Sequence, residues 1–130
     1  MIKGIGCDIV NIERIKPNAE FIERFAARIL GNKELSEFKQ QSFFDLRQQA
    51  CSLAKYYAGK EAFAKALGTG FRDGIFLQDI QIVHDMYGKP ELKIFGRTKE
   101  FLNKFAPNSN LHISLSDDFP FAQAIVIIEN

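Results

Sequence analysis

Three charged residues in two segments have the types and spacing that chemistry at a phosphate group requires. Asp8 lies within an apolar stretch, residues 4–10, and Glu61 and Lys65 stand one helical turn apart in a second segment. A carboxylate among apolar neighbours needs a cation or several hydrogen-bond donors to remain ionised. A carboxylate and an ammonium on one helix face can hold a divalent metal and a phosphate oxygen together. These residues are therefore candidates for a catalytic site.

Each of these residues also has a purely structural explanation. Asp8 could cap a helix or close an Asx-turn, and the two helix charges could simply pair with each other. Gly4 and Gly6 beside Asp8 favour a binding role, because glycine lets a ligand approach the backbone. The helix also carries a stripe of small residues that would bring its charges close to other structure: Ala58, Ala62 and Ala66.

The remaining motifs carry less information. Residues 68–70 could present backbone N–H groups to a phosphate, but they lack the Gly-Lys-Ser/Thr of a Walker loop and equally fit an ordinary helix stop. The Gly-Ile-Gly run begins a strand instead of following one, which excludes a dinucleotide fingerprint. His84 and His112 lack metal-ligand spacing and are expected to be structural. Cys7 and Cys51 are expected to be reduced packing residues.

The length and composition narrow the class of protein. The chain has 130 residues, which predicts one domain spanning 1–130. Hydrophobic residues make up 46% of it, enough for a substantial core. The 17 basic and 16 acidic residues give a net charge of +1, which argues against bulk nucleic-acid binding. No signal-peptide core is evident, and the apolar run 124–128 is too short to cross a bilayer. We therefore expect a soluble cytoplasmic protein that binds neither nucleic acid nor membrane.

Hydrophobic periodicity predicts the elements of the first half. A strand over 2–10 places Ile5, Cys7 and Ile9 on one face and leaves the other face nearly bare. Three helices should follow, over 19–30, around 34–41 and from about 45 to 67. Asn18 should cap the first of these helices, and Gly31 should close it.

The second half switches to strand periodicity. Four strands are predicted: 78–86, 91–95, 111–116 and 121–129. The first two are joined by a hairpin turn at 87–90, and the last two flank a polar turn at Asp117 and Asp118. Thr98 should cap a helix that runs to Phe105. The order β-ααα-ββ-α-ββ predicts an α+β fold in which a long central helix packs on a mixed sheet, with the helices on one face.

Four segments together resemble a known family. Residues 4–15 read Gly-Ile-Gly-Cys-Asp-Ile-Val-Asn-Ile-Glu-Arg-Ile, and residues 60–70 read Lys-Glu-Ala-Phe-Ala-Lys-Ala-Leu-Gly-Thr-Gly. A Gly-Lys-Pro turn follows at 88–90, and a His-Ile-Ser-Leu-Ser stretch at 112–116. In this order, over nearly the whole chain, they resemble phosphopantetheinyl transferases of the holo-acyl-carrier-protein synthase type. The resemblance implies the α+β 4′-phosphopantetheinyl transferase fold.

The resemblance also implies a reaction and its residues. Coenzyme A gives its 4′-phosphopantetheine arm to a serine of apo-acyl carrier protein, a step of fatty acid biosynthesis, leaving adenosine 3′,5′-bisphosphate. Asp8 and Glu61 match the magnesium-binding positions, and Lys65 matches a lysine near the diphosphate. Glu61, directly or through a metal-bound water, is the candidate base for the carrier serine; a magnesium-bound water would serve equally. Coenzyme contacts are implied for Lys65, Gly68, Thr69, Gly88, Lys89, Pro90, Ser116 and Asp117.

Partners follow from the same resemblance. Family members present a basic helix face to acidic carrier proteins, and the matching residues here are Arg14, Arg24 and Arg28. By spacing alone these arginines fit solvated surface charges equally well. The resemblance further implies a homotrimer with active sites at subunit interfaces, in which Asp8 and the helix residues lie on one side and the turn at 88–90 contributes coenzyme contacts.

Two positions depart from the family pattern. Asp117 stands where the family usually has histidine, and Tyr56 where it commonly has arginine, both where family members contact coenzyme A. Lys55 could replace the missing arginine. Asp117 must turn away from the coenzyme, be protonated or share a cation, unless it merely starts a turn. These departures leave open a degenerate member that binds coenzyme A without transferring it. The order of strands and helices also fits a non-catalytic α+β module that binds RNA or protein through its sheet, although none of the predicted strands carries the aromatic pattern of an RNA-recognition sheet.

Overall fold

The computed structural model describes residues 1–71 and 74–130, and its elements follow the predicted order. They are β1 (Ile2–Asn11), α1 (Ala19–Ile29), α2 (Asn32–Gln40), α3 (Leu46–Leu67), β2 (Ile80–His84), β3 (Pro90–Ile94), α4 (Gly96–Phe105), β4 (Asn110–Asp118) and β5 (Phe121–Glu129). Short 3-10 helices at Ile12–Arg14 and Leu77–Asp79 complete the fold. The α+β prediction is thereby confirmed.

The strands form two separate sheets instead of one. β1, β5 and β4 make a three-stranded sheet in that order, and β2 and β3 make a two-stranded hairpin. Every strand pairing within residues 1–71 and 74–130 is antiparallel, so the expectation of a mixed sheet is wrong. The hairpins β2–β3 and β4–β5 join neighbours by short turns, which antiparallel pairing permits. Periodicity identifies strands, but it does not say which strands hydrogen bond to each other.

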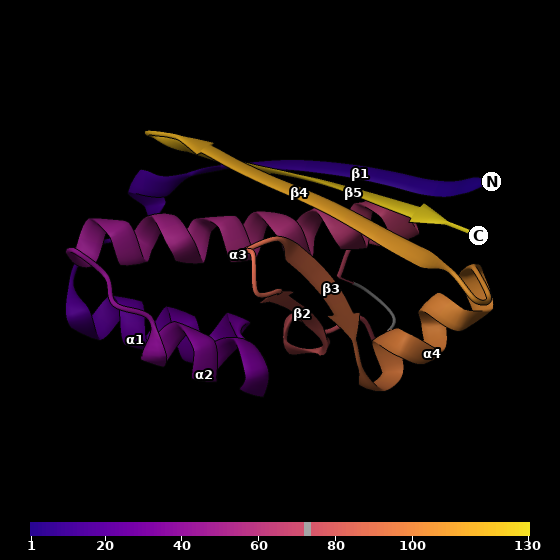
Figure 1. Ribbon diagram of the computed structural model, residues 1–130, viewed down its shortest axis with the longest axis horizontal. Helices are drawn as coiled ribbons and strands as arrows, with labels where there is room; N and C mark the ends of the chain where they lie inside the picture. Colours follow the sequence, from indigo (N-terminus) through magenta and orange to yellow (C-terminus); the bar gives the residue numbers. More distant parts are fainter. Residues whose placement is uncertain (72–73) are drawn as a thin grey trace.

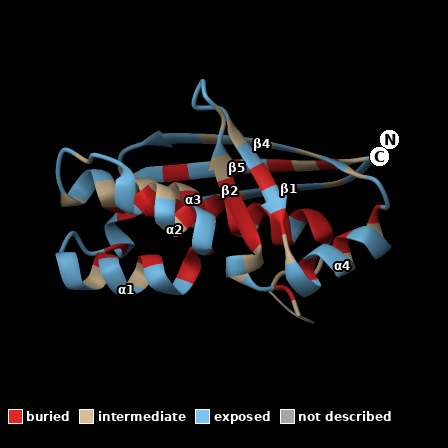
Figure 2. Cartoon of the chain, turned by 60° about the horizontal axis from the view of Figure 1, so that its bottom comes forward, coloured by how far each residue is buried: buried red, intermediate tan, exposed pale blue. Residues whose placement is uncertain are grey.

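Helix α3 is the centre of the molecule. It runs between the three-stranded sheet on one side and α1, α2 and the β2–β3 hairpin on the other (Figure 1). Buried residues occur all around it, because both layers pack against it. The outer faces of α1 and α2 are exposed, whereas β2 is buried along most of its length (Figure 2).

The glycines of β1 serve this packing. A Cβ atom on Gly6 would overlap the carbonyl oxygen of Ala62 and lie 2.7 Å from the backbone nitrogen of Ala66, and a Cβ on Gly4 would overlap the carbonyl oxygen of Ala66. The alanine stripe of α3 therefore lies directly on the glycine face of β1. The interpretation that these glycines admit a ligand is wrong, because a helix fills that space.

The opposite face of β1 is the exposed one. Ile5 and Ile9 are 66% and 61% exposed, and Cys7 between them is exposed as well. Cys7 is therefore not a packing residue, although both it and Cys51 are free thiols, as expected. The sheet thus has one face packed on α3 and one face that carries exposed apolar side chains.

Helix ends agree with the predicted caps in part. The side chain of Asn18 accepts a hydrogen bond from Phe21 N at 2.7 Å, which confirms it as the cap of α1. Gly31 does not close α1. It is the residue that caps the start of α2, and its backbone takes part in the first turn of that helix. Thr98 does not cap α4 but lies buried inside it, where its hydroxyl accepts from Phe76 N and donates to Asp79. A buried hydroxyl needs such partners, and sequence spacing does not reveal them.

Two turn boundaries also differ from prediction. β4 continues to Asp118, so Asp117 pairs with Ala122 within the ladder and does not start a turn. In the β2–β3 hairpin the Asp85 carboxylate accepts from Tyr87 N and Lys89 N, which organises the turn before Pro90.

Among residues 1–71 and 74–130, no helix is long and apolar enough to span a membrane.

Candidate active site

Asp8, Glu61 and Lys65 form one charged cluster where β1 crosses the carboxyl-terminal half of α3. The Lys65 ammonium donates to Asp8 Oδ1 and to the carbonyl of Cys7, each at 3.0 Å. The bond to Asp8 raises the pKa of Lys65, and Glu61 adds to that effect, so the ammonium stays charged. The Asp8 side chain is only 16% exposed, whereas Lys65 is 52% exposed. A mostly buried carboxylate therefore contacts a solvent-accessible positive charge.

Tyr57 is a member of this cluster that sequence reasoning missed. It lies one turn before Glu61, and burial, the hydrogen bond to Glu61 and the charge of Asp8 all raise the pKa of its phenol. The phenol therefore remains protonated and can donate to Glu61. In the sequence, the i, i+4 spacing of Tyr57 and Glu61 is the feature that could have indicated this contact.

The cluster has the donor set of a hard cation. Residues 1–71 and 74–130 contain no group of three or more His, Cys, Asp and Glu side chains that could hold a metal unaided. Asp8 and Glu61 supply two carboxylates, and magnesium is usually held by one or two because it keeps several of its waters. The residues present therefore fit Mg²⁺ that also binds a substrate phosphate, and they do not form a closed metal cage.

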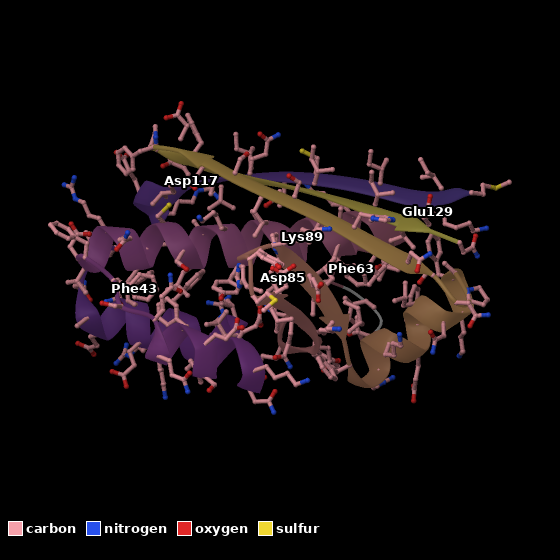
Figure 3. All side chains as sticks on the ribbon, viewed as in Figure 1. Phe43, Phe63, Asp85, Lys89, Asp117 and Glu129 are labelled. Atoms are coloured by element: carbon pink, nitrogen blue, oxygen red, sulfur yellow. The ribbon has the colours of Figure 1, made fainter. Side chains whose placement is uncertain are left out.

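A second feature is a pocket of about 490 Å³ on the other side of α3, which we call the hairpin pocket. Its lining comes from α2, α3, the β2–β3 hairpin and β4: Glu37, Gln41, Ser52, Lys55, Tyr56, His84, Gly88, Pro90 and Leu115. Lys89 extends from the same hairpin (Figure 3). Two of the predicted coenzyme contacts, Gly88 and Pro90, thus lie in a pocket together with Tyr56.

Asp117 forms an ion pair with Lys55 at the edge of this pocket. Lys55 Nζ lies 3.1 Å from Asp117 Oδ1, and Cys51 Sγ lies 3.3 Å from Asp117 Oδ2. Partial burial disfavours ionisation of Asp117, but the hydrogen bonds from Lys55 and Cys51 outweigh it and lower its pKa. Burial and Asp117 together raise the pKa of the Cys51 thiol. The Asp117 carboxylate is therefore ionised. It is paired with Lys55, the residue that could replace the arginine missing at position 56.

The other predicted coenzyme residues are spread more widely. Ser116 precedes Asp117 in β4, so its side chain points to the opposite, outer face of the sheet, where it pairs with Gln123 of β5. Gly68 ends α3 with φ +82°, and the hydroxyl of Thr69 donates to the Gly70 carbonyl at 2.9 Å. Within one chain the structure thus separates Ser116 from the hairpin pocket and keeps residues 68–70 near the charged cluster.

The three arginines are exposed on the amino-terminal segment. Arg24 forms an i, i+4 ion pair with Glu20 at 2.9 Å, and both side chains are largely exposed. Arg28 acts on the phenol of Tyr57, which places it beside the charged cluster. An aromatic row not anticipated from the sequence, Phe21, Phe25 and Tyr57, runs from α1 to α3 with ring centroids 6.1 and 5.9 Å apart.

The fold and the site define the class of this protein: the chain belongs to the 4′-phosphopantetheinyl transferase superfamily, whose sequence model matches residues 4–124. Its particular relatives are holo-(acyl-carrier-protein) synthases. One from Brucella ovis is 40% identical over 132 residues, which cover 99% of this chain and 96% of the relative.

Solved structures of the same type superpose on the whole chain. The holo-(acyl-carrier-protein) synthase of Neisseria meningitidis has a TM-score of 0.85 and 40% identity, with 100% of both chains covered. That of Bacillus anthracis, in complex with CoA (3′,5′-ADP), has a TM-score of 0.76 and 32% identity and covers 99% and 97%. That of Helicobacter pylori, in complex with coenzyme A, has a TM-score of 0.75 and 32% identity and covers 96% and 99%.

Proposed function

We propose that this chain transfers the 4′-phosphopantetheine arm of coenzyme A to a serine of apo-acyl carrier protein. The products are holo-acyl carrier protein and adenosine 3′,5′-bisphosphate. The observation that carries this proposal is the contact of Lys65 with Asp8 beside Glu61, in a chain of this superfamily. The coenzyme A held by two similar structures supports coenzyme A as the donor.

The charged cluster provides the groups that the transfer needs. The carrier serine attacks the phosphorus that bears pantetheine, and the bond to the adenylate phosphate breaks. Glu61 accepts the serine proton, directly or through a water, and Tyr57 orients its carboxylate by a hydrogen bond. Lys65 stabilises the negative charge that develops on the departing phosphate. Asp8 holds Lys65 in place from β1.

Magnesium completes this proposal. Asp8 and Glu61 would hold the ion, which when bound neutralises charge on the diphosphate oxygens. Lys65 then remains the one ammonium of the cluster, close to both carboxylates. The enzyme is expected to require Mg²⁺ for turnover.

The hairpin pocket is the site we assign to the coenzyme nucleotide. Gly88 and Pro90 line it from the β2–β3 turn, with Lys89 between them in the chain, and Lys55, paired with Asp117 of β4, lines it from α3. Gly68 and Thr69 would approach the diphosphate from the end of α3. Ser116 would contact coenzyme on the outer face of the sheet.

The carrier protein would dock on the amino-terminal segment. Arg14, Arg24 and Arg28 offer positive charge, and the aromatic row Phe21, Phe25 and Tyr57 leads from α1 towards Glu61. This arrangement suits an acidic helix that presents a serine to the cluster. We assign the reaction to fatty acid biosynthesis in the cytoplasm.

A homotrimer with shared active sites accounts for two features of the single chain. The charged cluster and the hairpin pocket lie at opposite edges of the three-stranded sheet, because Lys65 reaches the edge strand β1 and Lys55 reaches the other edge strand, β4. The outer sheet face exposes apolar side chains from two strands: Ile5, Ile9, Phe121 and Ile125. Burying this face between copies would bring the pocket of one copy to the cluster of the next. Sedimentation equilibrium at micromolar concentration tests the trimer; a monomer would contradict it.

Intact mass spectrometry of an acyl carrier protein tests the activity. Incubation of apo carrier with coenzyme A, Mg²⁺ and the enzyme should add the mass of one phosphopantetheine arm, and a chelator should prevent the gain. A degenerate member would show a thermal shift with coenzyme A but no mass gain. A non-catalytic module would show neither a mass gain nor a shift that depends on coenzyme A and Mg²⁺ together.

A further inference from the structure

A buried ion pair lies beneath the hairpin pocket and takes no part in the chemistry proposed above. Lys60 and Glu34 have no exposed surface, and Lys60 Nζ lies 2.6 Å from Glu34 Oε1. Lys60 also donates to the carbonyl of Leu77 at 2.9 Å and to that of Ile80. All three ammonium hydrogens are thereby used.

The carboxylate of this pair is equally saturated. Glu34 Oε1 accepts from Gly31 N at 2.9 Å, and Glu34 Oε2 accepts from Ile82 N at 2.9 Å. Burial raises the pKa of Glu34 and lowers the pKa of Lys60. The charge of Lys60 opposes the first shift, and the charge of Glu34 opposes the second. Five hydrogen bonds therefore join the start of α2, the middle of α3 and the backbone around β2.

Each member of the network lies one step from a residue of the pocket wall. Glu34 is one turn before Glu37 in α2, and Lys60 is one turn after Tyr56 in α3. In β2, Ile82 is two residues before His84, so their side chains share a face. The charges of Glu37 and Glu34 both act on the Tyr56 phenol, which confirms that the pair and the wall are adjacent.

The β2–β3 hairpin depends on such contacts for its position. It forms a sheet of its own and is not hydrogen bonded into the three-stranded sheet. Gln81 adds a second link, since its buried side-chain oxygen accepts from Lys33 N at 3.0 Å and Glu34 N at 3.3 Å. The polar groups of α2 and α3 thus help to set where the hairpin lies, together with the packing of β3 against β4.

Stability alone does not explain such a pair. Replacing a buried ion pair with apolar residues of similar volume is often neutral or stabilising, because desolvation offsets the attraction. What an apolar contact lacks is direction: hydrogen bonds to three particular carbonyl and carboxylate oxygens allow only one register between helix and hairpin.

We propose that the Lys60–Glu34 pair is a positioning device for the coenzyme pocket, which holds the β2–β3 hairpin against α2 and α3 in the geometry that coenzyme A fits. This inference rests on the proposed function, because it takes the hairpin pocket as the coenzyme site. Neither side chain touches substrate; both act through Tyr56, Glu37 and the hairpin.

A pair of variants separates positioning from stability. Lys60→Met leaves the Glu34 charge buried without its partner and should lower the melting temperature strongly. The double variant Lys60→Met/Glu34→Gln removes both charges and should recover much of that loss. Because the bonds to Leu77 and Ile80 are still missing, its Kd for coenzyme A, measured by calorimetry, should stay raised roughly tenfold. Its KM for apo carrier should change less than twofold.

Val126→Ala is the matched control. It removes a buried contact from β5, away from the hairpin, and should lower the melting temperature without changing the Kd for coenzyme A. A folded double variant that binds coenzyme A as the wild type does would overturn the inference. So would a loss of coenzyme affinity in Val126→Ala that matched its loss of stability.

Hydrogen exchange on the wild type tests the same idea without any variant. The amides of Gly31 and Ile82 should exchange as slowly as core amides before coenzyme A is added. Rapid exchange that slows only with coenzyme A would show that the pair does not preform the pocket. Failure of the wild type to bind coenzyme A at all would instead overturn the proposed function, and the inference with it.

Discussion

Gly6 of β1 and Ala62 of α3 meet so closely that a methyl group on Gly6 would overlap the Ala62 carbonyl oxygen. Asp8 follows Gly6 by two residues, and Glu61 precedes Ala62 directly. The contact therefore determines how far the Asp8 carboxylate lies from the groups of α3. Close backbone packing, and not a ligand, is what requires glycine here.

Gly6→Ala should consequently damage both stability and activity. The added methyl group must push β1 away from α3, which we expect to cost about 3 kcal/mol in free energy of unfolding. Urea denaturation followed by circular dichroism measures this loss. Lys3→Ala, on the exposed part of the same strand, is the control and should leave stability near the wild-type value. Equal stability of the Gly6 variant and wild type would contradict the contact.

Asp8→Ala and Glu61→Ala should each lower kcat by roughly a hundredfold or more while the fold remains intact, because each removes a carboxylate from the cluster. Steady-state rates over a magnesium titration, with circular dichroism as the folding check, measure this. Near-wild-type rates for both variants across that titration would show that the metal assignment is wrong.

Lys65→Ala should slow transfer with a smaller effect on coenzyme affinity. The ammonium is expected to act on charge that develops during bond breaking, so its loss should appear in kcat more than in the Kd for coenzyme A. Comparing kcat with a calorimetric Kd separates the two. A variant that lost affinity and kept its kcat would place Lys65 in ground-state binding instead.

Reversing three charges, Arg14→Glu, Arg24→Glu and Arg28→Glu together, should raise the KM for apo carrier about tenfold or more at low salt. The wild-type KM should itself rise steeply with salt, since exposed charges are screened within about 8 Å at physiological ionic strength. The KM for coenzyme A serves as the internal control. An unchanged carrier KM in the triple variant would remove this docking face.

Asp117→His should tighten coenzyme A by about fivefold, because it frees Lys55 and removes a negative charge whose interaction with a phosphate is worth roughly 1 kcal/mol at 4 Å in water. The gain should shrink at high salt. It should be absent for dephospho-coenzyme A if the 3′-phosphate is the group repelled. Asp118→His is the control at the neighbouring exposed carboxylate. Equal affinities of wild type and Asp117→His for both nucleotides would mean that Asp117 only holds Lys55 and Cys51.

The sequence by itself determined the order of the elements and the three charged residues of the cluster, Asp8, Glu61 and Lys65, but not Tyr57. Local signals were sufficient for this: Asn18 lies where a short polar side chain can accept from the next turn, and Glu61 and Lys65 share a helix face through i, i+4 spacing. Such features depend on neighbours along the chain, so they can be read from it.

Only the tertiary structure decided what lies opposite each residue. Gly6 is adjacent to Ala62, Asp117 to Lys55, and Lys60 to Glu34, and each pair joins residues far apart in the sequence. The identity of the opposite neighbour depends on sheet pairing and helix packing, which residue spacing along one chain does not encode. That is why the sequence suggested a ligand at the glycine face, where the structure packs a helix, and gave no sign of the buried pair under the hairpin.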